Sequence, residues 1–503
     1  MRTPGTPGAG ITGALDISLA SGNESHLADV ALPAQDQLCL RPYQEQCVNA
    51  LRRSYAGGRR APLLVLPTGG GKTVIFASVT AGARSKGRRV LILVHRRELI
   101  GQACSKLALA GVKHGVMAAG LDADHEELVI VGSVQSLARR LDRLSSFDLI
   151  VIDEAHHGVA GTWRAVLESQ PRAKLLGVTA TPMRSDGKGL GVEDDGIFDD
   201  LVTGPTISDL VGAGYLSPAK TFVPAERLDL AAVRVKAGDY LTTDLSLVVN
   251  RPEIIGDAVV QYNLRVAHKP AIAFCCTVAH ADHVAEMFRA AGYRSRCVHG
   301  GMAAPERDNL ISGLSDGRIE ILTTCDLISE GLDVPAVAAV LLLRPTKSLS
   351  LFLQQVGRGL RPAPGKIHLT ILDHAANTLL HGLPTSARSW SLKGQEKHES
   401  ERPGGGEMPV WLCPSCNEAN PAGARACDGC GTLSVTYEQP LPLTKAGGLV
   451  ELTPDRLQAV RRLNYGAIMR GRFTETELRE YARARGYNPF WVKHRLREQG
   501  IAA

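Results

Sequence analysis

The sequence predicts an α/β protein with two successive parallel-sheet domains, followed by a small metal-binding domain and a short α-helical region. Short apolar runs alternate with helical stretches twice, first from Leu63 to Thr179 and again from Ala271 to Asp373. Because the runs are continuously apolar, they are typical of strands buried on both faces, as in a parallel sheet covered by helices. Four clustered cysteines and a basic, helix-patterned end follow the second set.

Composition shifts divide the 503 residues into seven segments. A start rich in Gly, Pro, Ser and Thr predicts a flexible tail, and polar stretches between the apolar sets predict linkers. We expect a tail at 1–35, a first α/β domain at 36–216, a linker at 217–250, a second α/β domain at 251–390, a linker at 391–408, a metal-binding domain at 409–435 and a basic helical region at 450–503.

The overall composition predicts a globular protein of the cytoplasm. Hydrophobic residues make up 44% and charged residues 21%. The sequence contains no run of about 18 apolar residues, so we expect no membrane-spanning helix. The start lacks the basic and apolar pattern of a secretory signal. Seven of the eleven cysteines are scattered, so we expect free thiols and no disulfides.

The net charge of +6 is concentrated at one end of the chain. From Glu451 onward, eleven Lys and Arg residues stand against six Asp and Glu residues. A local excess of this kind indicates a polyanionic partner better than a mildly basic average does.

The run Leu63–Leu66 leads directly into a glycine-rich loop and then a helical stretch. Glycines let backbone N–H groups approach a polyphosphate, and the helix N-terminus favours its charge. Lys72 is placed to contact the β and γ phosphates, and the Thr73 hydroxyl to bind Mg²⁺. The strict loop pattern has a glycine where this chain has Leu66. The candidate loop residues are Pro67, Thr68, Gly69, Gly70 and Gly71.

Two carboxylates, Asp153 and Glu154, follow the apolar run Leu149–Ile152. Acidic groups at a strand end lie at the sheet edge where parallel sheets bind their ligands. Asp153 suits coordination of Mg²⁺, and Glu154 suits polarisation of an attacking water. An acidic pair in an ordinary surface loop is the alternative, and the preceding strand and phosphate loop disfavour it.

The four clustered cysteines follow the spacing C-x₂-C-x₁₀-C-x₂-C. Two CxxC knuckles at short separation are a strong signal for one tetrahedral Zn²⁺ with a structural role. A redox role is the alternative, disfavoured because neither knuckle lies at a strand–helix junction. The predicted ligands are Cys413, Cys416, Cys427 and Cys430.

The last segment places Arg485, Lys493 and Arg497 beside Tyr487 and Trp491. Basic residues beside aromatic rings can follow phosphates and stack on bases. A solvated helical face over a small aromatic core explains the same residues equally well, so both alternatives stay open.

These motifs together resemble helicase superfamily 2. Pro67–Thr73 looks like motif I, Asp153–His156 like motif II in its DEAH form, and Thr179–Pro182 like motif III. The resemblance implies two RecA-like domains that bind ATP and Mg²⁺ between them and act on nucleic acid. Leu40–Gln44 is similar to the motif that reads adenine. Arg41, Gln44 and His156 are therefore implied to contact ATP.

Two further segments of the first domain resemble motifs that follow the nucleic-acid backbone in this superfamily. Val94–Leu99 is similar to motif Ia and Gly132–Ser136 to motif Ib. The implied nucleic-acid contacts are Arg96, Arg97, Ser133 and Gln135.

The second domain has its own set of motifs. Phe274–Thr277 resembles motif IV, Glu330–Pro335 the end of motif V, and Gln354–Arg361 motif VI. By resemblance, Arg358 and Arg361 are arginine fingers, and Gln354, Gly331 and Asp333 contact ATP. Thr277 and Thr324 are implied at nucleic acid. The usual motif V threonine aligns with Cys325, after Thr323 and Thr324, so the contacting residue stays open.

A narrower resemblance comes from the zinc element. Trp411, Asn420 and Arg425 match the RanBP2-type zinc finger, and the whole arrangement looks like RadD-type bacterial DNA-repair ATPases and their phage-borne relatives. This implies a bacterial or phage-encoded helicase or translocase that acts on DNA rather than RNA in repair or recombination, with a single-strand-binding or repair protein as a partner. The alternatives are a duplex translocase that never unwinds and a nucleic-acid-responsive ATPase switch.

Overall fold

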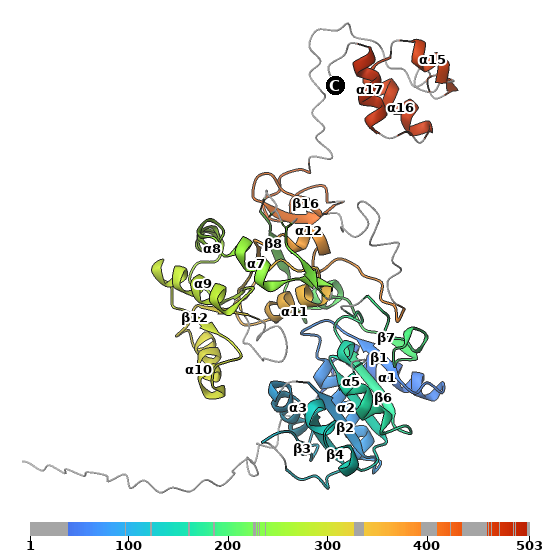
Figure 1. Ribbon diagram of the computed structural model, residues 1–503, viewed down its shortest axis with the longest axis vertical. Helices are drawn as coiled ribbons and strands as arrows, with labels where there is room; N and C mark the ends of the chain where they lie inside the picture. Colours follow the sequence, from blue (N-terminus) through green and yellow to red (C-terminus); the bar gives the residue numbers. More distant parts are fainter. Residues whose placement is uncertain are drawn as a thin grey trace, which may run out of the picture. The chain divides into compact units, whose positions relative to one another are not determined.

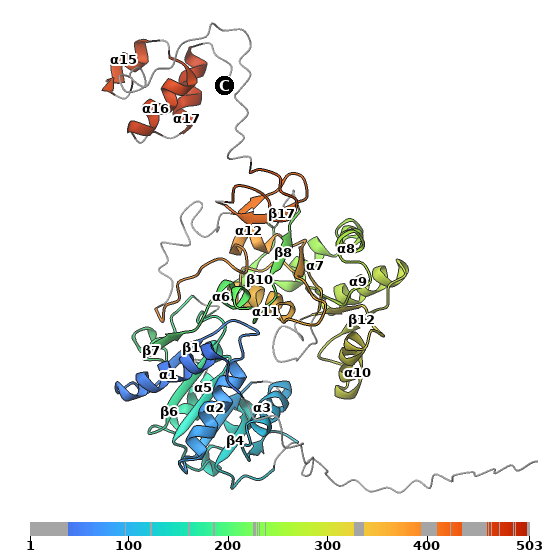
Figure 2. The same cartoon turned by 180° about the vertical axis from the view of Figure 1, so that it is seen from behind.

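The computed structural model describes residues 39–393, 410–434 and 460–499, apart from short gaps at 96, 121–122, 159–160, 185–186, 225–227, 229, 231, 237, 326–336, 423, 461, 464, 472, 486 and 488. The chain divides into two compact units, Met1–Ser434 and Val435–Ala503. The predicted tail at 1–35 lies outside the described residues. Figures 1 and 2 show the two units from opposite sides.

The first sheet has seven parallel strands in the order β3-β4-β2-β5-β6-β1-β7. Its core strands are buried on both faces, as the continuous apolar runs predict. The strands are β1 (Pro62–Val65), β2 (Val90–Val94), β3 (Gly115–Met117), β4 (Val129–Ser133), β5 (Leu149–Asp153), β6 (Lys174–Thr179) and β7 (Asp200–Thr203).

Helices cover both faces of this sheet (Figure 1). Leu64 and Ile92 pack with α1 to α3, whereas Leu63 and Leu91 pack on the opposite face with α4 and α5. Successive strand residues therefore alternate between two cores. The helices are α1 (Pro42–Ala56), α2 (Lys72–Arg84), α3 (Arg97–Leu109), α4 (Val134–Leu137), α5 (Gly161–Glu168) and α6 (Ile207–Gly212).

The second sheet has eight strands in the order β12-β13-β11-β14-β15-β8-β17-β16. The first six are parallel, and the last two pairings are antiparallel. This confirms two RecA-like parallel sheets. The strands are β8 (Ala219–Phe222), β11 (Ala271–Phe274), β12 (Ser295–Val298), β13 (Ile321–Thr324), β14 (Ala339–Leu342), β15 (Leu369–Asp373), β16 (Val410–Leu412) and β17 (Glu418–Pro421). The accompanying helices are α7 (Thr242–Val249), α8 (Pro252–Arg265), α9 (Val278–Ala290), α10 (Ala304–Ser315), α11 (Leu349–Gly359) and α12 (Asn377–His381).

The segment 217–250 is not a simple linker, which corrects the expectation from sequence. β8 pairs with β15 inside the second sheet. Further along, β9 (Val235–Lys236) and β10 (Asp239–Tyr240) form a hairpin, and α7 follows it. Val233, Leu245 and Val249 are buried with Cys276 of the second domain. Burial of these apolar side chains holds the segment on that domain.

The cysteine-rich segment is also continuous with the second sheet. β17 pairs with β8 through Glu418 and Ala419, and β16 completes the edge. The sequence had suggested a separate small domain. The pairing arises because β8 would otherwise leave an unpaired edge in the sheet.

In the described part of the unit after Ser434, at 460–499, the chain forms three short helices, which confirms the predicted helical end. They are α15 (Tyr465–Arg470), α16 (Glu475–Arg485) and α17 (Pro489–Glu498). Leu478, Tyr481 and Leu496 lie in their shared core. Among the described residues of the whole chain, every helix is too short or too polar to span a bilayer.

Candidate ATP site and zinc site

The glycine-rich loop joins β1 to α2 in a conformation that requires glycine. Gly69 and Gly71 have φ angles of +86° and +83°, which L side chains rarely adopt. A Cβ atom on Gly71 would lie 2.4 Å from the Gln44 Nε2 atom, and one on Gly70 would lie 2.8 Å from Leu66 Cγ. Because these positions carry no side chains, a ligand at the start of α2 can approach the loop backbone closely, the arrangement that suits phosphate.

Helix α1 packs its first turn against this loop. The Tyr43 hydroxyl donates to the Gly70 carbonyl over 2.8 Å, and Gln44 Nε2 donates to the same oxygen over 3.4 Å. Gln44 Oε1 accepts from the Arg41 backbone N–H at 2.9 Å. The Arg41 guanidinium lies 4.7 Å from the centre of the Tyr215 ring. Gln44, the residue expected at the adenine base, therefore lies beside the phosphate loop, and Arg41 is the N-cap of the same helix.

Asp153 and Glu154 lie where β5 ends, beside the loop lysine. Lys72 Nζ is 4.0 Å from Glu154 Oε1, and both side chains are nearly buried. Burial raises the pKa of Asp153 to about 6; the Glu154 charge acts in the same direction and Lys72 opposes it. Glu154 adopts a left-handed φ of +47°, and its N–H donates to Asp153 Oδ1 at 2.9 Å. Two buried carboxylates lie near a single ammonium, so their negative charge is only partly compensated. Carboxylate oxygens are the ligands that Mg²⁺ prefers, so Mg²⁺ fits here.

A chain of polar contacts leads from the acidic pair to the second domain. His156 Nδ1 lies 3.5 Å from Glu154 Oε2 and 3.2 Å from Thr179 Oγ1. Thr179 Oγ1 donates to the Thr181 carbonyl at 2.9 Å, and Thr181 Oγ1 donates to Ser350 Oγ at 2.6 Å. Ser350 belongs to α11. Sequence reasoning missed Ser350, because its position gives no signal until the two domains are packed.

Helix α11 packs directly on the phosphate loop. A Cβ atom on Gly357 would lie 2.4 Å from Thr68 Cβ. Gln354 and Arg358 are buried on the same helix, and Arg361 follows it, with its pKa lowered by burial. The Ser217 N–H donates to the Leu360 carbonyl at 2.8 Å. The structure thus brings motif VI beside motif I.

The structure places the predicted nucleic-acid residues in different surroundings. Ser133 and Gln135 form a bonded pair over 2.9 Å at the end of β4. Thr277 caps α9 by accepting from the His280 N–H at 3.1 Å. Thr324 is fully buried in this conformation, which argues against the expectation that it contacts a strand. Arg96 and the Arg97 side chain lie outside the described residues, as do Gly331 and Asp333, which were expected at ATP.

The four clustered cysteines converge on one point. Their sulfur atoms all lie within 4.8 Å of one another, and the closest pairs are 3.5 and 3.6 Å apart. Sulfurs placed tetrahedrally at about 2.3 Å from Zn²⁺ would be about 3.8 Å apart, so the group fits zinc. Each knuckle closes with the same turn: the N–H groups of Asn417 and Gly431 donate to Cys413 and Cys427 carbonyls at 2.9 Å.

Asn420 joins the two knuckles. Its side chain is buried, donates to the Glu418 carbonyl at 2.9 Å and accepts from the Asp428 N–H at 3.0 Å. Arg265 of α8 donates to the Cys416 carbonyl at 3.1 Å. The knuckles are therefore fastened to each other and to the second domain.

Comparison with known protein families gives two matches. Residues 37–184 match the family described as type III restriction enzyme, res subunit. Residues 254–363 match the helicase conserved C-terminal domain. The two matched ranges include the phosphate loop, the acidic pair and the whole of α11.

Individual proteins and a solved structure are also similar to this chain. A 51.5 kDa protein of a Lactococcus phage is 33% identical over 367 residues, which cover 73% of this chain and 76% of that protein. A Saccharomyces cerevisiae protein described as an ATP-dependent helicase, IRC3, is 34% identical over 66% of this chain, which spans about half (51%) of that relative. The solved structure of the type ISP restriction-modification enzyme LlaBIII bound to DNA aligns with a TM-score of 0.51 at 20% identity, covering 67% of this chain and 28% of that one.

Proposed function

Because the chain belongs to helicase superfamily 2 and is a nucleic-acid-dependent ATPase, we propose that it is a DNA helicase or translocase that works in repair or recombination. The observation that carries the proposal is the contact between Gly357 of α11 and Thr68 of the phosphate loop. It places two arginines of one RecA-like domain beside the nucleotide loop of the other. Hydrolysis and domain movement are then coupled at this contact.

The roles proposed for the cleft residues follow their positions. Lys72 and the loop Pro67–Gly71 bind the phosphates, while Thr73 and Asp153 hold Mg²⁺. When bound, Mg²⁺ neutralises charge that develops on the phosphate oxygens. Glu154 orients the attacking water, and Arg358 and Arg361 stabilise the transition state. The proposed accessory contacts to ATP are Arg41, Gln44, His156, Gly331, Asp333 and Gln354.

DNA is proposed over RNA as the substrate. The structural neighbour described as bound to DNA shares the fold of both motor domains, which supports this preference. ATP turnover measured with single-stranded DNA, duplex, forked DNA and RNA of equal length tests it. We expect stimulation by at least one DNA form well above that by RNA, and equal or greater stimulation by RNA would contradict the proposal.

A duplex translocase that never separates strands is the second candidate. The match to a restriction-enzyme subunit family over residues 37–184 favours it. Strand-displacement and triplex-displacement assays distinguish the two. Unwinding of a fork supports the helicase, whereas displacement of a third strand from intact duplex supports the translocase. Stimulated ATP turnover with neither displacement would instead indicate a nucleic-acid-responsive switch.

For the cysteine-rich element, we propose a structural Zn²⁺ held by the two knuckles. The bridging role of Asn420 between the knuckles supports assignment to the RanBP2 type. The combination of motor and zinc element supports the RadD-type relationship. A single-strand-binding or repair protein is the partner that this relationship would predict, and co-purification with such a protein tests it.

A further inference from the structure

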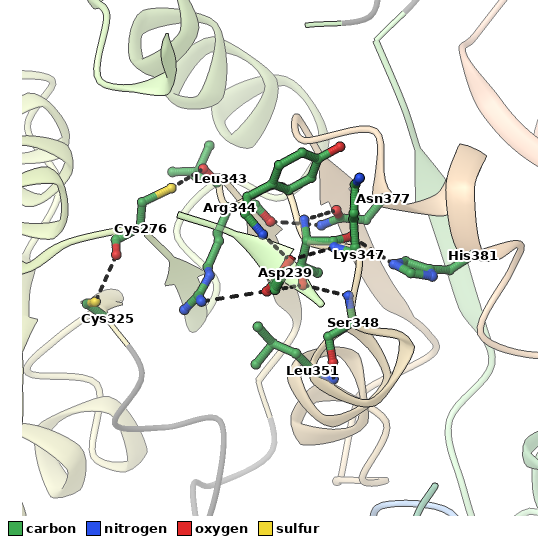
Figure 3. A network of polar contacts seen from close by, with 12 residues as sticks. Asp239, Cys276, Cys325, Leu343, Arg344, Lys347, Ser348, Leu351, Asn377 and His381 are labelled. Carbon is green, nitrogen blue, oxygen red and sulfur yellow. Dashed lines mark hydrogen bonds and ion pairs between the residues drawn. The ribbon is translucent and has the colours of Figure 1, made fainter. Parts of the chain in front are cut away.

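The hairpin β9–β10 lies against the loop that precedes the arginine-bearing helix. Tyr240 contributes to a small apolar core with Leu245 and Cys276, which fixes the hairpin on the second domain. Figure 3 shows Asp239 of β10 between Arg344 and Lys347. These two residues belong to the loop 344–348, which runs from β14 to α11.

Asp239 uses both carboxylate oxygens on this loop. Oδ2 accepts from the Thr346 hydroxyl at 2.8 Å and lies 3.9 Å from Arg344 Nη2. Oδ1 accepts from the Lys347 backbone N–H at 2.7 Å. The Lys347 ammonium lies 5.1 Å from the centre of the Tyr240 ring. Charge-assisted bonds of this kind are roughly twice as strong as neutral ones.

The bonds to Asp239 continue into α11. Thr346 Oγ1, which donates to Asp239, also accepts from the Ser348 N–H at 3.0 Å. Ser348 is the N-cap of α11, and its hydroxyl accepts from the Leu351 N–H at 3.2 Å. Arg358 lies two turns further along the same rigid helix. The orientation of the first turn therefore sets where Arg358 points.

We propose that Asp239 is a positioning residue for ATP hydrolysis: it holds the loop 344–348 and so places α11 and Arg358 against the phosphate loop. This inference rests on the proposed role of Arg358. The segment 217–250, which the sequence predicts to be a linker, would then contribute to ATP hydrolysis in the cleft. The same loop begins beside β11, because Leu342 pairs with Phe274.

The fold of the loop has other supports. The Thr346 N–H donates to Asn377 Oδ1 at 2.9 Å, and Asn377 Nδ2 donates to the Arg344 carbonyl at 3.0 Å. His381 Nε2 lies 2.9 Å from the Thr346 carbonyl. These three contacts do not involve Asp239. Removal of its carboxylate should therefore loosen the orientation of α11 without unfolding the domain.

The test is the steady-state ATP turnover of Asp239→Ala in the full-length protein with saturating DNA. A misplacement of about 1 Å can cost about 10²-fold in rate, so we expect kcat to fall about 10- to 100-fold. The KM for ATP should stay within about twofold, since ground-state contacts to the nucleotide are untouched. Asp239→Asn keeps an acceptor oxygen without the charge and should recover part of the rate. Thr346→Val removes the linking hydroxyl, and the double variant should be no worse than either single one.

Asp244→Ala is the matched control. Asp244 lies in the same segment and accepts two bonds from the Arg234 guanidinium, at 2.7 and 2.8 Å, and within the described part of the chain its hydrogen bonds and ion pairs stay in that segment, away from the loop 344–348. Its kcat should equal that of the parent protein. A kcat of Asp239→Ala close to the parent value, or an equal loss in both variants, would overturn the proposal. Thermal unfolding of each variant identifies any loss that comes from a destabilised domain.

The variant Arg358→Ala distinguishes a failure of the proposed role of Arg358 from a failure of the positioning role of Asp239. If it hydrolyses ATP normally, the proposed role of Arg358 is wrong. If Arg358→Ala is inactive while Asp239→Ala is fully active, the cleft assignment stands and only the positioning role of Asp239 fails.

Discussion

The ATP cleft and the C-terminal helical unit both bury charged and polar side chains, but they use them differently. In the cleft, Gln354 Nε2 and Glu154 Oε2 are buried without a hydrogen-bond partner among the described residues. In the C-terminal unit, the buried Arg495 donates to carbonyls of Ile468, Met469 and Gly471 at the end of α15. An unsatisfied buried polar atom costs about 1–3 kcal/mol, which the fold tolerates where a ligand supplies the missing partner.

Gln499 Nε2 of the C-terminal unit is also buried without a partner among the described residues, so the contrast is between individual side chains: Glu154 and Gln354 keep an atom for a ligand, whereas Arg495 is kept for folding. Glu477 makes this clear, because its carboxylate closes a capping box with Thr474: it accepts from the Thr474 N–H at 2.8 Å and the Thr474 hydroxyl at 2.9 Å. This agrees with the capping spacing visible in the sequence. Glu154, equally acidic and buried, closes no such motif. Substitutions in the cleft should therefore lower ATP turnover, whereas substitutions in the C-terminal unit should lower its stability and leave turnover unchanged.

The largest expected effect is in the phosphate loop and the acidic pair. Lys72→Ala should reduce ATP turnover to background, because it removes the cation of the phosphate loop. Glu154→Gln should keep ATP binding and block hydrolysis, since Asp153 still binds Mg²⁺ while the water is no longer polarised. Nucleotide binding by fluorescence and turnover by phosphate release measure both. Glu477→Gln is the control, expected to lower the stability of the C-terminal unit only. Near-normal turnover in pure Glu154→Gln would refute its role.

The arginines give the next largest effect. Arg358→Ala and Arg361→Ala should each lower kcat by about 10³-fold or more, the usual worth of an arginine finger, with nucleotide binding largely kept. Arg495→Ala, the matched buried arginine, should leave turnover unchanged and destabilise the C-terminal helices. A loss of less than tenfold in kcat in both Arg358→Ala and Arg361→Ala would contradict this prediction.

Zinc removal should have an intermediate effect. We expect one Zn²⁺ per chain by metal analysis of protein purified without added zinc, and its loss from the double variant Cys413→Ser, Cys416→Ser. Because β17 pairs with β8, the loss should lower the melting temperature of the second domain, by about 2–4 °C for each kcal/mol lost. Turnover should fall but persist. The exposed Cys39 offers a control, Cys39→Ser, without effect. Complete unfolding on chelation would contradict this prediction.

The smallest effect concerns the exposed basic residues of the C-terminal unit. Tyr481, Tyr487 and Trp491 pack together, with ring centres 5.2–6.0 Å apart; Tyr481 and Trp491 belong to the core of the unit, whereas Tyr487 is exposed. Arg485 donates to the Leu463 carbonyl at 3.1 Å and is partly structural. Lys493 and Arg497 are exposed, and we predict that they contact phosphates.

Alanine at Lys493 and Arg497 should reduce the slope of log affinity against log salt by about 0.7–0.9 for each lost contact. Binding titrations at several salt concentrations measure it, and turnover at saturating nucleic acid should match the parent protein. An unchanged slope would contradict the prediction, as expected if this unit packs against the motor domains or a partner protein.

Local patterns in the sequence determined much of the architecture. The continuous apolar runs predicted the parallel strands, and both sheets are confirmed. The glycines at 69–71 predicted a tight loop, and the spacing of the cysteines predicted one convergent group. Each of these features depends on residues close together in the chain, so its physical cause is visible before folding.

Only the tertiary structure decided the features that depend on packing between distant segments. The sequence predicts a linker at 217–250, yet burial of Leu245 and Val249 against Cys276 makes this segment part of the second domain. The zinc element reads as a separate module, yet β17 completes an open sheet edge. Thr324, Ser350 and Asp239 likewise acquire their burial or their bonds from partners far away in sequence. Apolar burial and hydrogen bonding are set by proximity in space, which polarity and spacing along one chain do not encode.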